Sequence, residues 1–222
     1  MLSGYLTITD DSVLGIIASK DFKENISAQA SKITQSVKVE ISAIISRVLF
    51  GSATVNDLLN GKLKDDFGLT GNLVTTAIQN IINHISQNIE IKVEQGFGNT
   101  AVVVKVNILP GDLGKITSVP GGSYVSYGIY GGGNVDWLEW LLTRGTQVVI
   151  GKFWLFPYAE GRTRSGGTSI MEPIIGKKDR DSFRVDPNHA GTLQDNFITR
   201  ALEPAFYDIL NLVAAATVRS VQ

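Results

Sequence analysis

The sequence predicts an α+β fold, with long N-terminal helices followed by a mostly antiparallel sheet and a C-terminal helix. Apolar residues recur with a helical period from about residue 21 to residue 88, and the period changes to strict alternation at residue 89. A helical period returns near residue 193. We therefore expect a single domain over residues 1–222, with a helical part at about 1–88, a β-rich part at about 89–192 and a C-terminal helix at about 193–222.

The composition favours a protein that buries surface against partners. The chain has 222 residues, enough for one large domain with a sizeable core. It is 43% hydrophobic and only 18% charged, which is less polar surface than is usual for a lone monomer. A net charge of −1 gives no general attraction to nucleic acid or anionic lipid. The absence of cysteine excludes disulfides, thiolate chemistry and cysteine zinc sites.

The first residues do not resemble a signal peptide, because they lack a basic start and are interrupted by Asp10 and Asp11. No apolar run approaches the roughly 18 residues that a membrane span needs. We therefore expect a soluble protein of the cytosol that made it. Residues 1–19, with an apolar segment at 13–18, predict either a short helix or an arm that docks on another part of the chain.

Two amphipathic helices are predicted in the first part. The first runs from Asp21 to Phe50, begins with an Asp21–Glu24 capping box and ends at Gly51. Its apolar face is Phe22, Ile26, Ile33, Val37, Ile41, Ile44 and Val48. After small helical turns in residues 51–72, the second helix runs from Asn72 to Asn88. Its apolar face is Leu73, Ala77, Ile78, Ile81, Ile82 and Ile85. Together they predict a helical hairpin or layer.

The β-rich part begins with a half-buried strand at 89–94, a turn at 96–99 and a strand at 100–109, which together predict a hairpin. Further strands are expected at 123–130 and 147–158, and a brief one around Phe183. The rest of residues 159–192 reads as irregular. The last helix runs from about Gln194, and Pro204 should kink or restart it because proline lacks a backbone donor.

A short helix in residues 135–146 holds two of the three tryptophans. Asn134 is placed to cap its start, and Gly145 to end it in a left-handed conformation. Trp137 and Trp140 share one face with Leu141. Such a pair is typical of a core. Alternatively, the helix presents part of itself to a neighbouring subunit, because Trp and Arg are enriched at interface centres. The two interpretations are compatible.

Catalytic and metal-binding patterns are scarce. The two histidines, His84 and His189, lack a second histidine at ligand spacing, and His84 reads as a surface or boundary residue. Asp179 and Asp181 offer carboxylates to a hard cation but lack calcium-loop spacing. Neither a Gly-x-Ser-x-Gly elbow nor a phosphate or dinucleotide loop occurs, while a Ser–His–Asp set stays open because its members meet only in space. We predict no enzyme activity, no cofactor and no metal.

Basic residues gather in the irregular part of the chain. They are Arg162, Arg164, Lys177, Lys178 and Arg180. Such a cluster can contact a nucleic-acid backbone and line a DNA passage. Nearby acidic residues largely cancel its charge, which favours the alternative of a solvated loop. These acidic residues are Glu160, Glu172, Asp179 and Asp181.

Two stretches of the second half resemble neck and tail-completion proteins of tailed bacteriophages. The first, Trp140-Leu-Leu-Thr-Arg-Gly-Thr, is similar to that family's aromatic or acidic residue followed by a Gly-Thr turn into a strand. The second, Asp195-Asn-Phe-Ile-Thr-Arg-Ala-Leu-Glu-Pro-Ala, resembles the start of its C-terminal helix. Residues 161–167 are similar to its Arg-Thr-Gly segment, in a different order along the chain. Residues 58–69 look like phage virion proteins in general.

The resemblance implies a virion protein that forms a ring at the head–tail joint and has no catalytic residues. Its partners would be copies of itself, other neck or tail proteins and DNA in the channel, with no membrane. Ring contacts are heterologous, so each subunit offers two different patches. By analogy, the interface candidates are Trp137, Trp140, Arg144, Phe197 and Arg200. The alternatives are a phage-associated cell-wall hydrolase, or a glycan- or small-ligand-binding domain that uses the Tyr- and Trp-rich strands.

Overall fold

The computed structural model describes residues 3–8, 26–95, 102–108, 113–126, 133–150, 153–157, 169–173 and 183–221. Its fold is α+β, as predicted. The chain contacts group into two compact units. Unit 1 comprises Met1–Arg47, Ile82–Asp112 and Leu202–Gln222, and unit 2 comprises Val48–Ile81 and Leu113–Ala201. The single domain over residues 1–222 stays a prediction.

The first long helix is α3 (Ile26–Phe50). Its buried residues recur at every fourth position and are Ile33, Val37, Ile41, Ile45 and Leu49. The predicted face was therefore wrong at its end, because Ile44 and Val48 are only half-buried. The buried row keeps its four-residue step after Ile41, so that it winds slowly around the helix. The predicted capping box, at Asp21 and Glu24, lies outside the described residues.

Unit 1 contains a three-stranded antiparallel sheet of order β1-β3-β2. Its strands are β1 (Ser3–Ile8), β2 (Glu90–Gln95) and β3 (Val102–Asn107). The predicted β2–β3 hairpin is confirmed. For its first residues the structure shows a docking arm, because β1 pairs with β3. The apolar segment at 13–18 lies outside the residues described.

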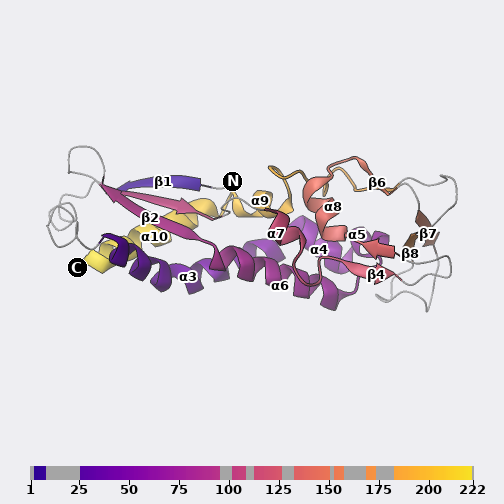
Figure 1. Cartoon of the computed structure of the whole chain (residues 1–222), viewed down its shortest axis with the longest axis horizontal. Coiled ribbons are helices and arrows are strands. Elements are labelled where there is room, and N and C mark those ends of the chain that lie inside the picture. The colour runs from indigo at the N-terminus through magenta and orange to yellow at the C-terminus, as the bar shows by residue number, and fades with distance from the viewer. Residues whose placement is uncertain are drawn as a thin grey trace. The chain divides into compact units, whose positions relative to one another are not determined.

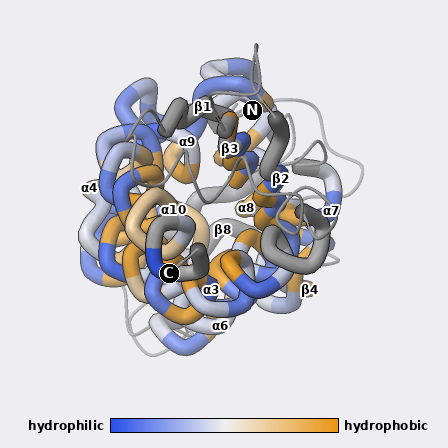
Figure 2. The backbone as a smooth tube through the Cα atoms, turned by 90° about the vertical axis from the view of Figure 1, so that its left-hand side faces the viewer, coloured by the Kyte–Doolittle hydropathy of each residue, from blue (hydrophilic) through white to orange (hydrophobic). Residues whose placement is uncertain are grey.

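The C-terminal helix is interrupted as predicted. Helix α9 (Phe197–Leu202) ends before Pro204, and α10 (Phe206–Val221) begins after a turn. In unit 1, α10 lies beside β1 (Figure 1). Figure 2 shows hydrophobic and hydrophilic residues alternating around α3, α6 and α10, as expected for helices with one buried side. Within the described ranges, no helix is both long and apolar enough to cross a membrane.

The helices that begin in unit 2 are separated at the glycines of the sequence. Residues 51–72 contain α4 (Ala53–Asn60) and α5 (Lys62–Asp66), which confirms the predicted small helical turns. Helix α6 (Gly71–Gln87) carries the predicted apolar face, except that Val74 rather than Leu73 is buried. Two shorter helices follow, α7 (Leu113–Thr117) and α8 (Trp137–Thr143).

Among the residues that the structure describes, the strands of unit 2 form three antiparallel pairs rather than one sheet. They are β4 (Tyr124–Ser126) with β5 (Gly133–Val135), β6 (Val148–Ile150) with β9 (Phe183–Arg184), and β7 (Phe153–Pro157) with β8 (Ser169–Pro173). The predicted strand at 147–158 is thus divided between β6 and β7. The expectation that residues 159–192 are irregular apart from Phe183 was wrong at β8, because pairing with β7 makes a strand of a segment without alternation.

Candidate interface surfaces

Helix α8 is anchored in unit 2 through its first tryptophan. Trp137 is fully buried, and its indole Nε1–H donates a hydrogen bond of 2.9 Å to the carbonyl oxygen of Gly121. The backbone of Gly121 has φ +90°, and a Cβ there would lie 2.9 Å from the carbonyl oxygen of Leu73. Only glycine fits this crossing without strain. The close approach places the loop that precedes β4 directly against α6, and the hydrogen bond from Trp137 joins α8 to the same loop.

Trp140 packs against the aromatic ring of Phe67 at the end of α5. The ring centroids of Trp140 and Phe67 are 6.2 Å apart, with the planes tilted by 50°. The hydroxyl of Tyr124 donates a hydrogen bond to the carbonyl oxygen of Phe67. Trp140 is 7% exposed and Phe67 is fully buried. Both tryptophans are therefore core residues of unit 2.

The ends of α8 differ in how well the sequence predicted them. The N-cap residue is Asp136 and not Asn134, which lies in β5 opposite Val125 and so belongs to the strand. The Asn134 amide instead donates a hydrogen bond to the Asp136 carboxylate. Burial, followed by repulsion from Glu139, raises the pKa of Asp136, while the bond from Asn134 lowers it. At the other end Gly145 has φ +56°, as predicted.

The loop before α9 is locked between α8 and α9. The N–H of Gly145 donates a 2.7 Å hydrogen bond to the carbonyl oxygen of Gly191. A Cβ at Gly191 would lie 2.4 Å from the carbonyl oxygen of Leu141. Asn196 is fully buried, and its side-chain oxygen accepts hydrogen bonds from the N–H groups of Ile198 and Thr199. It thereby caps α9, which no sequence prediction had assigned to it.

The two arginines among the predicted interface residues are exposed, whereas the aromatic ones are not. Arg200 donates to both carboxylate oxygens of Asp195, at 2.6 and 3.0 Å, and to the carbonyl oxygen of Ala190 at 3.1 Å. The hydrogen bond from Arg200 lowers the pKa of Asp195. Arg144 pairs with Glu139 at 3.2 Å. Phe197 is 2% exposed, like the tryptophans a core residue.

All five predicted interface residues thus lie in unit 2. Only the arginine side chains are available to a neighbour, and a role for the five at an interface stays a prediction. The predicted DNA-channel contacts lie outside the described residues. They are Arg162, Arg164, Lys177, Lys178 and Arg180.

A cluster that the sequence analysis missed joins α4, α5 and the loop at residues 185–190. His189 Nε2 lies 3.3 Å from Asp57 Oδ2, and His189 Nδ1 lies 3.1 Å from the Thr54 hydroxyl. The two carboxylate oxygens of Asp57 also accept hydrogen bonds from the N–H groups of Lys62 and Leu63 at the start of α5. The signal was absent from the sequence because Asp57 and His189 meet only in the fold.

This cluster has the residue types of a nucleophile, a base and an acid, but its contacts join α4 to the loop at residues 185–190. We call the contacts of His189 with Asp57 and Thr54 the clasp. Thr54 is only 6% exposed, which hides its hydroxyl from a substrate. Both carboxylate oxygens of Asp57 already accept hydrogen bonds from the backbone at the start of α5. Among the residues described, no group of three or more His, Cys, Asp or Glu is arranged to hold a metal ion. Asp179 and Asp181 lie outside that part of the chain, and His84 is half-buried on α6, as expected for a boundary residue.

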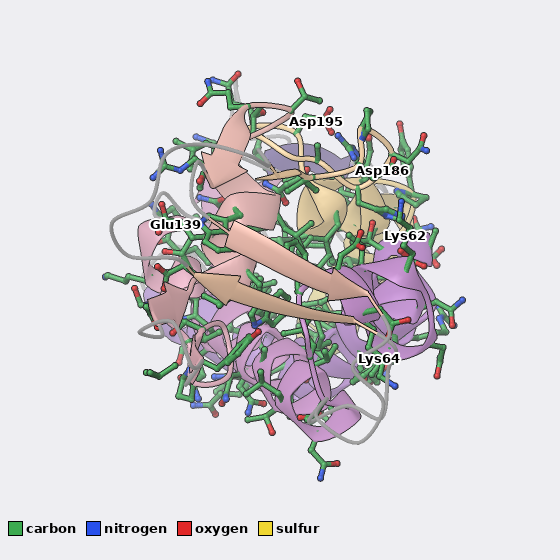
Figure 3. The ribbon with its side chains drawn as sticks, turned by 90° about the vertical axis from the view of Figure 1, so that its right-hand side faces the viewer. Lys62, Lys64, Glu139, Asp186 and Asp195 are labelled. Atoms are coloured by element: carbon green, nitrogen blue, oxygen red, sulfur yellow. The ribbon has the colours of Figure 1, made fainter. Side chains whose placement is uncertain are left out.

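Acidic side chains surround the clasp. Burial raises the pKa of Asp66, Lys62 opposes this, and the carboxylates of Asp57, Asp65 and Asp186 add to it. Figure 3 shows Lys62 and Asp186 on the same side of unit 2, projecting from α5 and from the loop that carries His189. The surroundings therefore disfavour a charged Asp66 carboxylate.

Unit 1 exposes one side of two helices. Val39 on α3 is 78% exposed and Tyr207 on α10 is 75% exposed. Each belongs to a row of exposed residues spaced by four positions, and we call these two rows the α3–α10 face. The rows are Gln35, Val39, Ala43 and Arg47 on α3, and Tyr207, Asn211, Ala215 and Arg219 on α10. A 3.6 Å ion pair between Arg47 and Asp208 brings the two helices together.

Unit 2 also exposes two large apolar side chains, Val125 of β4 at 47% and Leu193 at 56%. Leu193 lies in the turn before α9, where the N–H of Thr192 donates to the carbonyl oxygen of Asp195. Comparisons of the chain with protein-family models, curated proteins and solved structures find no match. A functional assignment therefore depends on the surfaces and contacts described above.

Proposed function

We propose that this protein is a structural subunit that forms a ring in the neck or tail of a tailed bacteriophage. The observation that carries the proposal is that each compact unit exposes large apolar side chains on well-anchored elements. They are Val39 and Tyr207 in unit 1, and Val125 and Leu193 in unit 2. A ring contact joins two different patches of neighbouring subunits, and exposed apolar side chains on each unit are what such patches are built from.

The two stretches that resemble phage neck and tail-completion proteins adjoin the same loop in unit 2. The first ends at the α8 turn, where Gly145 bonds to Gly191. The second begins α9, from which Arg200 bonds to Ala190. Segments some 50 residues apart in the sequence thus hold one loop, which exposes Leu193 at its outer turn. This arrangement supports the proposal that the two motifs act together to position this loop.

The test is the particle mass of the full chain by mass photometry, alone and with phage neck and tail proteins. We expect a particle mass that is a discrete multiple of 24.0 kDa, the mass of one chain. In Val39→Asp and Tyr207→Asp, that multiple should be lost or shifted to at least tenfold higher protein concentration, because a charge at an interface core is desolvated without a partner. A strict monomer at micromolar concentration, with no assembly on phage proteins, would overturn the proposal.

A matched control is Thr75→Asp, which adds the same charge at an exposed position of α6 in unit 2. This variant should assemble as the wild type does. All three variants should keep the helical circular dichroism spectrum, because the replaced side chains are exposed. Equal loss of assembly in the control would show that added charge, and not the α3–α10 face, is responsible.

The alternative function is a phage-borne cell-wall hydrolase, and the Asp57–His189–Thr54 contacts are the observation that favours it. The assay is release of soluble fragments from peptidoglycan by the wild type, His189→Ala and Asp57→Asn. Under our proposal the wild type releases none. Release by the wild type that either variant abolishes, with an unchanged circular dichroism spectrum, would establish the hydrolase instead.

A further inference from the structure

Strand β1 covers one edge of β3 in unit 1. All six residues of β1 pair with β3 in antiparallel register, from Ser3 opposite Asn107 to Ile8 opposite Val102. Strand β2 covers the other edge of β3. If β1 were withdrawn, β3 would therefore present a row of unpaired backbone donors and acceptors.

The edge of β3 that β1 covers has a sequence that favours pairing with another strand. Residues 102–107 read Val-Val-Val-Lys-Val-Asn, and β-branched residues of this kind strongly favour strands. An open edge of this sequence recruits a strand from another chain, which is the usual route to edge-to-edge association. One lysine, Lys105, is the only charge in the segment that opposes such pairing. Strand β1, from the same copy or from another copy of the chain, matches this edge in the register seen in the structure.

The connections make β1 the separable strand of the sheet. Only six positions of the sequence, 96–101, separate β2 from β3, whereas positions 9–101 separate β1 from β3. The stretch from 9 to 25 connects β1 to α3, and a chain of this length spans up to roughly 60 Å when extended. Gly4 within β1 lacks a side chain, which weakens the strand's own preference for the sheet.

We propose that in the assembled ring β1 of one subunit pairs with β3 of the neighbouring copy, in the register seen within the chain. The inference rests on the proposed ring. The exchange keeps all six residue pairs, so it loses no backbone hydrogen bond. The balance between the two pairings is then set by the local concentration of neighbouring edges, which is high in a ring. The exchanged strand ties adjacent subunits together.

A cysteine-free chain allows a direct test. Leu6 lies opposite Val104, and Cα atoms in such antiparallel pairs are within disulfide range. We would mix Leu6→Cys with Val104→Cys, each carrying one cysteine, assemble the mixture, oxidise it and run a non-reducing gel. The expected result is a covalent dimer in the mixture that neither variant forms alone. The double variant should give a ladder of covalent oligomers when assembled.

The control pairs Leu6→Cys with Val93→Cys. Val93 lies on β2 in the same row, and two strand spacings of roughly 10 Å in all put it beyond disulfide range. The Thr7→Cys and Val103→Cys pair is the substitute if Leu6→Cys fails to fold. Rings whose double variant forms only disulfides within a chain would overturn the exchange and leave the proposed function standing. Mass photometry that finds no ring would overturn both.

Discussion

At the scale of single residues, the charges around the clasp define how unit 2 responds to pH. Asp66 is half-buried, and burial is the main cause of its raised pKa, with Asp57, Asp65 and Asp186 adding to it against Lys62. A carboxyl whose pKa is higher in the fold than in the unfolded chain contributes stability below the unfolded value, near 3.8. That contribution is lost as the pH rises through the folded pKa.

Replacing Asp66 with Asn should therefore stabilise the protein at neutral pH. The amide is neutral, so it avoids the desolvation and repulsion that the Asp66 carboxylate meets above its pKa. Thermal unfolding should show a higher Tm for Asp66→Asn at pH 7, with the difference shrinking as the pH falls towards 4. Asp195→Asn is the contrasting variant, because the pKa of Asp195 is lowered by Arg200. It should lower the Tm at pH 7, and a higher Tm would contradict this account.

At the scale of elements, the clasp unites a helix start with a distant loop. Asp57 serves the start of α5 through the N–H groups of Lys62 and Leu63, and it holds the loop through His189. The bonds to Lys62 and Leu63 are local in the sequence, whereas the contact with His189 is long-range. The bonds to the start of α5 contribute most of the stability, because losing a helix cap costs about 0.5–2 kcal/mol.

Asp57→Ala should therefore cost more stability than His189→Ala. The first loses the cap and the clasp, roughly 1.5–3 kcal/mol together, and the second loses only the clasp, about 1 kcal/mol. Urea unfolding measures both. Asn56→Ala, on the same helix, removes only the exposed bond from Asn60 and should change stability by a few tenths of a kcal/mol. Equal losses for the two clasp variants would show that Asp57 does not cap α5.

The tight contact at Gly191 makes the loop before α9 intolerant of a side chain. In Gly191→Ala the added Cβ would meet the carbonyl oxygen of Leu141 at 2.4 Å and the Cβ of Asn196 at 2.6 Å. We expect a loss of about 1–3 kcal/mol in chemical unfolding, as for other overpacked sites. The control is Gly71→Ala at the first residue of α6, where nothing lies within 4 Å and stability should stay the same or rise by less than about 1 kcal/mol. Unchanged stability in Gly191→Ala would refute the packing described here.

At the scale of the whole molecule, stability and assembly are expected to depend on different residues. Trp137, Trp140 and Phe197 are buried, so replacing them would unfold unit 2 before it could report on a contact. Arg144 and Arg200 are exposed, but Arg200 also bonds to the backbone of Ala190. Of the five predicted interface residues, Arg144 therefore separates the two properties best.

Arg144→Ala should weaken assembly while leaving the fold intact. Its ion pair with Glu139 is exposed on both sides, and such pairs contribute about 0–1 kcal/mol. We expect the Tm to fall by less than about 4 °C. If Arg144 lies in a ring contact, the assembly midpoint in mass photometry should move to about tenfold higher concentration. The comparison variant is Arg47→Ala, which removes a similarly exposed ion pair in unit 1. Unchanged assembly of Arg144→Ala would show that Arg144 does not lie in the interface.

The elements that depend on local pattern were predictable from the sequence. The apolar period placed α6 to within a residue at each end, and the missing donor of Pro204 explains why α9 and α10 are separate. The alternation of residues 89–94 and the turn after it predicted the β2–β3 hairpin. In each case the information lies within a few neighbouring residues.

The tertiary structure decided what depends on partners far along the chain. Strands β1 and β8 exist because β3 and β7 supply their hydrogen bonds, and neither strand alternates clearly. Asn134 is a strand residue rather than a helix cap because β4 pairs with β5. Asp57 and His189 meet only when α4 and the loop before α9 pack together. The sequence by itself determined periodicity, capping tendency and chain breaks, because these are short-range properties; pairing and juxtaposition are long-range, and only the fold brings those residues together.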